Sequence, residues 1–175
     1  MVSNNLLFSE KIFIAGAHGM VGSSIQRILK KYGYGKGNNS GQLFTPSRIE
    51  LDLSNSAEVE NWFKKNRPTI VINAAAKVGG IYANSLKPVD FLLDNLKIQN
   101  NIIESSWRHN VKRFLFLGSS CIYPKFAPQP IQEESLLKSH LEPTNQWYAI
   151  SKICGIKLCE AFKKQYDFDA ICLMP

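Results

Sequence analysis

Short apolar runs along the chain alternate with longer segments in which apolar residues recur every three or four positions. The short runs predict strands at residues 11–15, 42–45, 69–73, 113–117 and 170–173. The longer segments predict helices at 21–32, 54–65, 89–109 and 147–166, with Ser54 as the N-cap of the second helix. Strands that alternate with helices form right-handed βαβ units. The sequence therefore predicts an α/β fold with a Rossmann-like, doubly wound parallel sheet.

Two connecting segments are polar. Residues 33–41 are rich in glycine and asparagine, and residues 125–145 form a long, proline-containing loop of the kind usually kept for function. The chain has 175 residues, 45% of them hydrophobic, which is enough for one domain with a real core. We expect residues 1–175 to be a single domain.

A glycine motif follows the first predicted strand and opens the first helix. Gly16 permits a tight turn, Gly19 lets the backbone approach a pyrophosphate, and Gly22 lets the helix pack closely on the strand. Met20 and Val21 stand where the helix opens, at the end that binds phosphate. The motif predicts a dinucleotide site, and the alternative is a turn with a structural role only.

The end of the second strand carries no acidic residue to hold the ribose hydroxyls of NAD. Arg48 is available instead for a 2′-phosphate, with His18 of the glycine turn to assist, so we predict NADP as the cofactor. Asp52, followed by Leu53, suits the adenine amino group. The alternatives are a surface arginine, a neutral loop histidine and an aspartate that helps to start the next helix.

Small residues follow the third strand, in the segment 73–80. Ala75 and Ala76 would let the backbone lie close to the cofactor, because they have little side chain to keep it away. Ordinary packing of a loop against a helix needs small residues too, so both interpretations stay open.

The fourth strand and the last helix carry the candidate catalytic residues. Ser119 and Cys121 follow the strand at its carboxyl end, where open α/β sheets bind their ligands. Tyr148 and Lys152 are four residues apart, on one face of the helix. We expect the ammonium to lower the pKa of the phenol, which suits proton exchange with an alcohol or ketone. Taken alone, Tyr-x-x-x-Lys is also common on amphipathic helices.

The net charge is +7, and the basic pairs fall near predicted helix ends. A basic total suits a polyanionic small molecule, whereas no interleaving of aromatic and basic residues indicates nucleic acid. No run of 18 apolar residues predicts a membrane span, and the first residues do not resemble a secretory signal. The four cysteines form no CxxC pair. We therefore expect no metal site, and reduced thiols in a cytoplasmic protein.

These motifs together resemble the extended short-chain dehydrogenase/reductase family. The specific strings are Ala74–Gly80, Gly118–Lys125 and the segment from Glu142 to Lys152. The resemblance implies a nucleotide-sugar substrate, GDP-4-keto-6-deoxy-D-mannose, which is epimerised at C3 and C5 and then reduced at C4 by NADPH. It also implies pairing into a homodimer, which the sequence itself does not settle.

The resemblance assigns a role to each candidate. Ser119 would hold the C4 oxygen, Tyr148 would donate the proton, and Lys152 would lower the pKa of Tyr148 and bind the nicotinamide ribose. Cys121 would act as acid and base in the epimerisation, since protons next to a ketone are acidic.

The chain departs from the family pattern in two respects. Family members usually carry arginine where His18 stands. The family's epimerisation histidine and its sugar-nucleotide lobe would lie beyond Pro175, so we expect a sheet truncated before the C-terminal substrate lobe. The alternatives are another nucleotide-sugar enzyme of this fold and a non-catalytic NADP-binding protein. A dehydratase is disfavoured, because Ser120 and Cys121 occupy the place next to the active serine where dehydratases of this group tend to carry an Asp-Glu pair.

Overall fold

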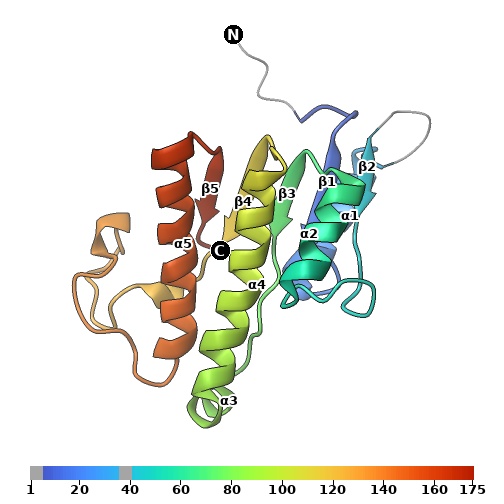
Figure 1. The fold of residues 1–175 in the computed structure, drawn as a ribbon. Helices are drawn as coiled ribbons and strands as arrows, with labels where there is room; N and C mark the ends of the chain where they lie inside the picture. Colours follow the sequence, from blue (N-terminus) through green and yellow to red (C-terminus); the bar gives the residue numbers. More distant parts are fainter. Residues whose placement is uncertain (1–5, 36–40) are drawn as a thin grey trace.

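The computed structural model describes residues 6–35 and 41–175, and it places a parallel sheet at the centre of the fold (Figure 1). Its strand order is β2-β1-β3-β4-β5, and all four neighbouring pairs are parallel. The predicted α/β fold with a Rossmann-like parallel sheet is confirmed. The strands are β1 (Lys11–Ala15), β2 (Gln42–Phe44), β3 (Ile70–Asn73), β4 (Arg113–Leu117) and β5 (Ala170–Leu173).

The helices agree with the prediction to within a few residues, apart from one that was missed. They are α1 (Met20–Lys31), α2 (Ser56–Asn66), α3 (Ile81–Leu86), α4 (Pro88–Arg108) and α5 (Gln146–Tyr166), with short 3-10 turns η1 (Ser120–Ile122) and η2 (Glu133–Ser135). The missed helix is α3. Part of the predicted connection at 33–41 lies outside the described residues.

The predicted N-cap of α2 was wrong by one residue. Asn55 caps the helix, because its side-chain oxygen accepts from the amides of Ala57 and Glu58 at 3.1 and 3.3 Å. The Ser54 hydroxyl donates instead to Asp52 Oδ1 at 2.7 Å. Both residues favour caps, and the backbone turn decides between them.

The two faces of the sheet are covered by different helices. Helices α2, α4 and α5 lie side by side over one face (Figure 1), where Phe13, Phe114 and Phe116 are fully buried. The other face of β1 carries Ile12 and Ile14, which pack with apolar residues of α1. Burial on both faces explains why the central strands read as continuous apolar runs.

Helix α5 lies very close to β4. A Cβ atom at Gly155 would be 2.4 Å from Cζ of Phe116, so no larger residue fits there without movement. Next to this contact the amide of Gln99 on α4 donates to the carbonyl of Ser151 on α5 at 2.7 Å. These contacts fix the first turns of α5 relative to the carboxyl end of β4.

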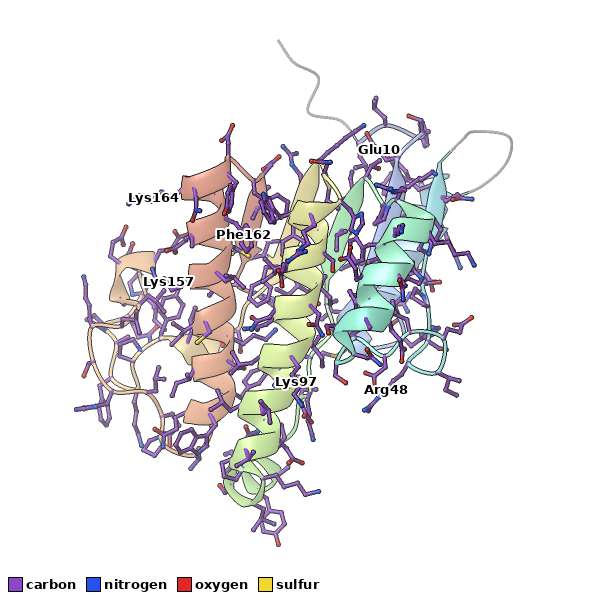
Figure 2. All side chains as sticks on the ribbon, in the orientation of Figure 1. Glu10, Arg48, Lys97, Lys157, Phe162 and Lys164 are labelled. Atoms are coloured by element: carbon purple, nitrogen blue, oxygen red, sulfur yellow. The ribbon has the colours of Figure 1, made fainter. Side chains whose placement is uncertain are left out.

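Three pairs of lysines lie at one end of the molecule. The helices run antiparallel to the strands, so their last turns meet at the amino ends of the strands (Figure 1). The pairs Lys30–Lys31, Lys64–Lys65 and Lys163–Lys164 close α1, α2 and α5 there. Figure 2 shows Lys164 at this end and Arg48 at the opposite end. These three pairs therefore lie away from the carboxyl ends of the strands, where open α/β sheets bind their ligands.

Within the part of the chain that the structure describes, no helix combines the length and apolarity needed to cross a bilayer.

Candidate active site

The turn after β1 is held by two close backbone approaches. Gly16 has φ +76°, and a Cβ atom there would lie 2.7 Å from the amide nitrogen of Ala75. At Gly22 a Cβ atom would lie 2.2 Å from the carbonyl oxygen of Gly16. Gly19 is different, because its nearest protein atom would be 3.4 Å away. Packing therefore demands glycine at positions 16 and 22, whereas position 19 keeps free space beside the turn.

The amino end of α1 opens at this turn. The Gly19 amide donates to Gly16 O at 3.0 Å, and the Ser23 amide donates to Gly19 O at 2.9 Å. The amides of Met20, Val21 and Gly22 come before the first hydrogen bond of the helix, and no side chain caps them. The first turn contains no acidic residue, and the Met20 side chain is 88% exposed. This helix end can accept an anion.

A cleft of about 410 Å³ lies at the carboxyl ends of β1 and β3. Most of the predicted cofactor residues line it: Gly16, Gly19, Arg48, Asp52, Leu53, Ala75 and Ala76. His18 and Ile98 line it as well. Met20, Val21, Gly22 and Lys152 do not line the cleft. The first three form the adjoining helix end, and Lys152 belongs to a second cluster beside it.

The rim of the cleft carries Arg48 on the loop after β2, exposed to solvent. Within the described ranges Arg48 makes no ion pair. Across the rim, His18 Nε2 lies 3.2 Å from Thr45 O. Hydrogen bonds from Ser47 hold the pKa of Glu50 below its usual value, with a smaller contribution from the charge of His18. Because Arg48 is exposed and makes no ion pair with the described residues, its guanidinium is available to a ligand.

Asp52 braces the turn that leads into α2. Its Oδ1 accepts from the amide and the hydroxyl of Ser54 at 2.9 and 2.7 Å. These bonds, and to a smaller extent the charge of Arg48, lower the pKa of the Asp52 carboxyl. Asp52 therefore helps to start α2, which was the alternative interpretation of this residue. It also lines the cleft.

The second cluster brings together three of the four predicted catalytic residues. Ser119 leads into the short turn η1, and its oxygen accepts from the Cys121 amide at 3.5 Å. The side chain of Ser119 also lowers the pKa of both the Cys121 thiol and the Tyr148 phenol, so it lies close to both groups. A hydroxyl, a thiol and a phenol therefore meet at the carboxyl end of β4, although they come from two elements.

Lys152 lies behind this group and is 4% exposed. Its Nζ donates to Leu117 O at 2.8 Å and lies 4.9 and 5.8 Å from the ring centroids of Phe116 and Tyr148. Burial lowers the pKa of Lys152 to about 8, against a smaller opposing effect of Cys121. The ammonium is held by a backbone carbonyl rather than by a carboxylate.

The expected lowering of the Tyr148 pKa was wrong for this structure. Burial raises the pKa of the phenol, the charge of Cys121 adds to the rise, and the Ser119 hydrogen bond opposes it. Burial likewise raises the pKa of the Cys121 thiol, against the Ser119 hydrogen bond and the charge of Lys152. Loss of water on burial is the largest effect on the pKa of both groups. Both groups hold their protons near neutral pH and can act as acids.

Sequence reasoning missed the polar side chains of α4 that support the site. Asn95 Oδ1 accepts from the Lys77 amide at 2.7 Å, and Asn95 Nδ2 donates to Lys77 O at 3.0 Å. Lys77 Nζ pairs with Asp90 and Asp94 at 2.9 and 2.7 Å. Asn95 and Gln99 are buried polar residues four positions apart on a predicted helix, which is a signal that the sequence did contain.

Three or more histidine, cysteine, aspartate or glutamate side chains nowhere converge as a metal site within residues 6–35 and 41–175.

Residues 12–175 match the NAD dependent epimerase/dehydratase family, and the chain belongs to that family. It is similar to GDP-L-fucose synthase 1 of Arabidopsis thaliana, with 54% identity over 167 residues, and to GDP-L-fucose synthase of Sinorhizobium fredii, with 51% identity over 170 residues. These alignments cover 95% and 97% of this chain but 50% and 52% of the relatives. The chain thus spans about half the length of the curated relatives it matches.

A solved structure agrees with this placement. The GDP-D-glycero-L-gluco-heptose synthase from Campylobacter jejuni, determined in the presence of NADPH, has a TM-score of 0.89 and 36% identity. The match covers 97% of this chain and 48% of that chain. The resemblance inferred from the motifs is confirmed.

The buried ammonium makes stability depend on pH. Lys152 has a pKa of about 8 when folded and 10.5 ordinarily, so between these values the unfolded chain binds the extra proton. The cost of burying Lys152 is fully present below pH 8, and the free energy of unfolding rises from there to about pH 10.5. We expect this contribution to total roughly 3 kcal/mol and to vanish in Lys152→Met. Urea unfolding across this pH range measures it.

Lys157→Met is the matched control, since Lys157 lies on the same helix with its side chain 48% exposed. This variant should keep the pH dependence of the unmodified chain. Parallel curves for the unmodified chain and Lys152→Met would contradict the buried-ammonium account.

Proposed function

We propose that residues 1–175 form the NADP-binding part of an enzyme that epimerises GDP-4-keto-6-deoxy-D-mannose and reduces it to GDP-L-fucose. The observation that carries the proposal is the cluster at the carboxyl end of β4, where the Ser119 oxygen accepts from the Cys121 amide at 3.5 Å and Lys152 Nζ lies 5.8 Å from the centroid of the Tyr148 ring. The similarity to two GDP-L-fucose synthases over almost the whole chain supports the same substrate. A homodimer would agree with the family resemblance.

The residues around the cleft suit NADP(H). The amides of Met20, Val21 and Gly22 would hold the pyrophosphate, because they are free at a helix end with no acidic side chain. Arg48 would hold the 2′-phosphate, and the Asp52–Leu53 segment would border the adenine. The backbone at Ala75 and Ala76 would lie along the cofactor toward the second cluster. When bound, the cofactor supplies the hydride for the C4 ketone.

The phenol and the serine serve the reduction. Ser119 would hold the C4 oxygen by a hydrogen bond, and Tyr148 would donate its proton to that oxygen as negative charge develops there. The raised pKa of Tyr148 keeps the proton on the phenol beforehand. Lys152 lies behind the Tyr148 ring, where its positive charge would stabilise the phenolate that remains. It would also bind the nicotinamide ribose.

The thiol serves the epimerisation. Hydrogens at C3 and C5 are acidic because they lie next to the C4 ketone, and Ser119 would increase that acidity by polarising the carbonyl. The raised pKa keeps a proton on Cys121, so the thiol would return a proton at these carbons, and its thiolate would remove one. The thiol and the phenol share Ser119 as a neighbour, so one bound sugar could meet both groups. Two different reactions thereby use one polarised ketone.

The proposal predicts that the chain binds NADPH in preference to NADH. In Arg48→Ala, NADPH should bind about 10- to 100-fold more weakly while NADH binding stays the same, because only the 2′-phosphate meets the guanidinium. Fluorescence titration of the chain with each cofactor measures both affinities. Arg27→Ala is the control, since Arg27 is exposed on α1 and does not line the cleft. Equal affinities for the two cofactors, or an unchanged ratio in Arg48→Ala, would overturn the NADP assignment.

In the whole protein that carries this chain, two variants should separate the epimerisation from the reduction. Cys121→Ser should block incorporation of solvent deuterium at C3 and C5. Tyr148→Phe should retain that exchange and slow NADPH oxidation by about 10²–10⁴-fold, the usual loss on removing a general acid. NMR of the recovered sugar nucleotide and absorbance of NADPH give the two readouts.

Cys154→Ser is the control for these variants, because Cys154 is exposed on α5 outside the cluster. It should change neither readout. Near-normal reduction by Tyr148→Phe would rule out Tyr148 as the proton donor.

A further inference from the structure

The end of the molecule at the amino ends of the strands carries a group of exposed lysines, which we call the basic end. Its members are the pairs Lys30–Lys31, Lys64–Lys65 and Lys163–Lys164, and all six side chains are exposed. Helix α1 packs on one face of the sheet, and α2 and α5 pack on the other (Figure 1). The lysines therefore flank the strand ends on both sides of the sheet.

The helix dipoles account for only part of this charge. The carboxyl end of a helix carries about half a negative charge, which a single cation more than offsets. Each of the three helix ends has two lysines in its last turn. None of the six forms an ion pair with a described residue. Positive charge therefore remains at the basic end after the helix ends have been neutralised.

The carboxylates near the basic end do little to reduce this excess. Several of them are already paired with other basic side chains, in the pairs Glu10–Lys112, Asp169–Arg113 and Glu104–Arg108, at 3.0, 2.8 and 2.6 Å. Asp167, the C-cap of α5, is exposed and makes no ion pair with the described residues. A partner at this end would therefore meet six lysines and this carboxylate.

Apolar side chains are exposed beside the lysines. Leu7 and Phe8 come just before β1 and are 57% and 51% exposed. Tyr32 directly follows the lysine pair of α1 and is 66% exposed, and Tyr166 ends α5 and is 47% exposed. Lysines together with exposed leucine and aromatic side chains are typical of protein surfaces that lie in the interface of a bilayer.

We propose that the basic end is a docking surface for a bilayer that contains anionic phospholipids. The lysines would meet the negatively charged headgroups, and Leu7 and Tyr32 would enter the region between the headgroups and the acyl chains. Nucleic acid is the less suitable partner. An exposed leucine gains nothing from a phosphate backbone, and lysine provides a point charge rather than the planar fork with which arginine binds phosphate.

This orientation leaves the proposed active site open. The cleft lies at the carboxyl ends of β1 and β3, which is the end of the sheet opposite to the lysine pairs. A chain that lies with its basic end on a membrane therefore turns the cleft toward the solution. The docking surface and the cleft share no residue, so the proposal does not depend on the function proposed above.

The test measures how much of the chain sediments with vesicles of phosphatidylcholine, with and without phosphatidylserine. We expect binding only to vesicles with phosphatidylserine, and its loss at high salt, which screens the charges. The double variant Lys163→Gln, Lys164→Gln should bind about 10- to 30-fold more weakly, because each lysine near an anionic surface adds to the affinity. The double variant Lys30→Gln, Lys31→Gln should behave in the same way.

The matched control is Lys97→Gln with Lys138→Gln, which removes the same charge from exposed positions outside the basic end. Figure 2 shows Lys164 at the basic end and Lys97 well away from it. The control should bind the vesicles like the unmodified chain. Equal weakening in the control, or equal binding to vesicles without phosphatidylserine, would overturn the proposal.

The variant Leu7→Ser separates a bilayer from other polyanions. It should bind the vesicles about 5-fold more weakly, because a leucine that enters the interface loses contact with water. Its binding to a double-stranded DNA fragment should equal that of the unmodified chain. Binding to DNA without binding to the vesicles, or vesicle binding unchanged in Leu7→Ser, would contradict a bilayer as the partner and indicate a site for polyanions in general.

Discussion

The close contact between α5 and β4 is the constraint on which the candidate site depends. Gly155 lets the helix lie against the Phe116 ring, and Lys152 directs its ammonium to the carbonyl of Leu117. With both contacts made, Tyr148 reaches Ser119 at the end of the strand. Burying an ammonium against one carbonyl is costly, and the lowered pKa of Lys152 expresses that cost. The fold thus keeps a destabilising group where the proposed chemistry uses its charge.

A second pair of close approaches organises the cofactor side. The turn at Gly16 lies directly against the backbone at Ala75, and α1 lies against that turn at Gly22. Asn95 then holds the loop after β3 from its other side, through both backbone groups of Lys77. The cleft is therefore bounded by backbone segments that support one another. A dinucleotide that lies along such walls would meet these peptide groups as well as the side chains of Arg48 and Asp52.

The sequence was sufficient for the fold. The periods of apolar residues predicted each strand and the four long helices, because burial on one or both faces dictates those periods. The glycine motif predicted a turn in which positions 16 and 22 allow no side chain. The helix α3 was missed because it has only six residues and follows two glycines, so its apolar period is too short to recognise.

The pKa of Tyr148 was predicted wrongly for a physical reason. Whether Lys152 lowers the pKa of Tyr148 depends on where the ammonium points and on how much water both groups lose, and sequence spacing gives neither. The gathering of basic helix ends away from the cleft follows from the antiparallel run of helices and strands, which a total charge conceals. Asn95 and Gln99 could have been flagged as polar residues on a buried face. Their partners depend on tertiary contacts.

The central claim is that a nicotinamide dinucleotide lies along the carboxyl ends of the strands, from the glycine turn to Tyr148. Hydrogen–deuterium exchange of the backbone amides, with and without NADPH, tests it most directly. The account predicts slower exchange in segments 16–23, 74–77 and 148–152, and no change at the basic helix ends 64–67 and 163–167. Protection confined to those basic ends would contradict it, because the cofactor would then bind through net charge at the opposite edge of the sheet.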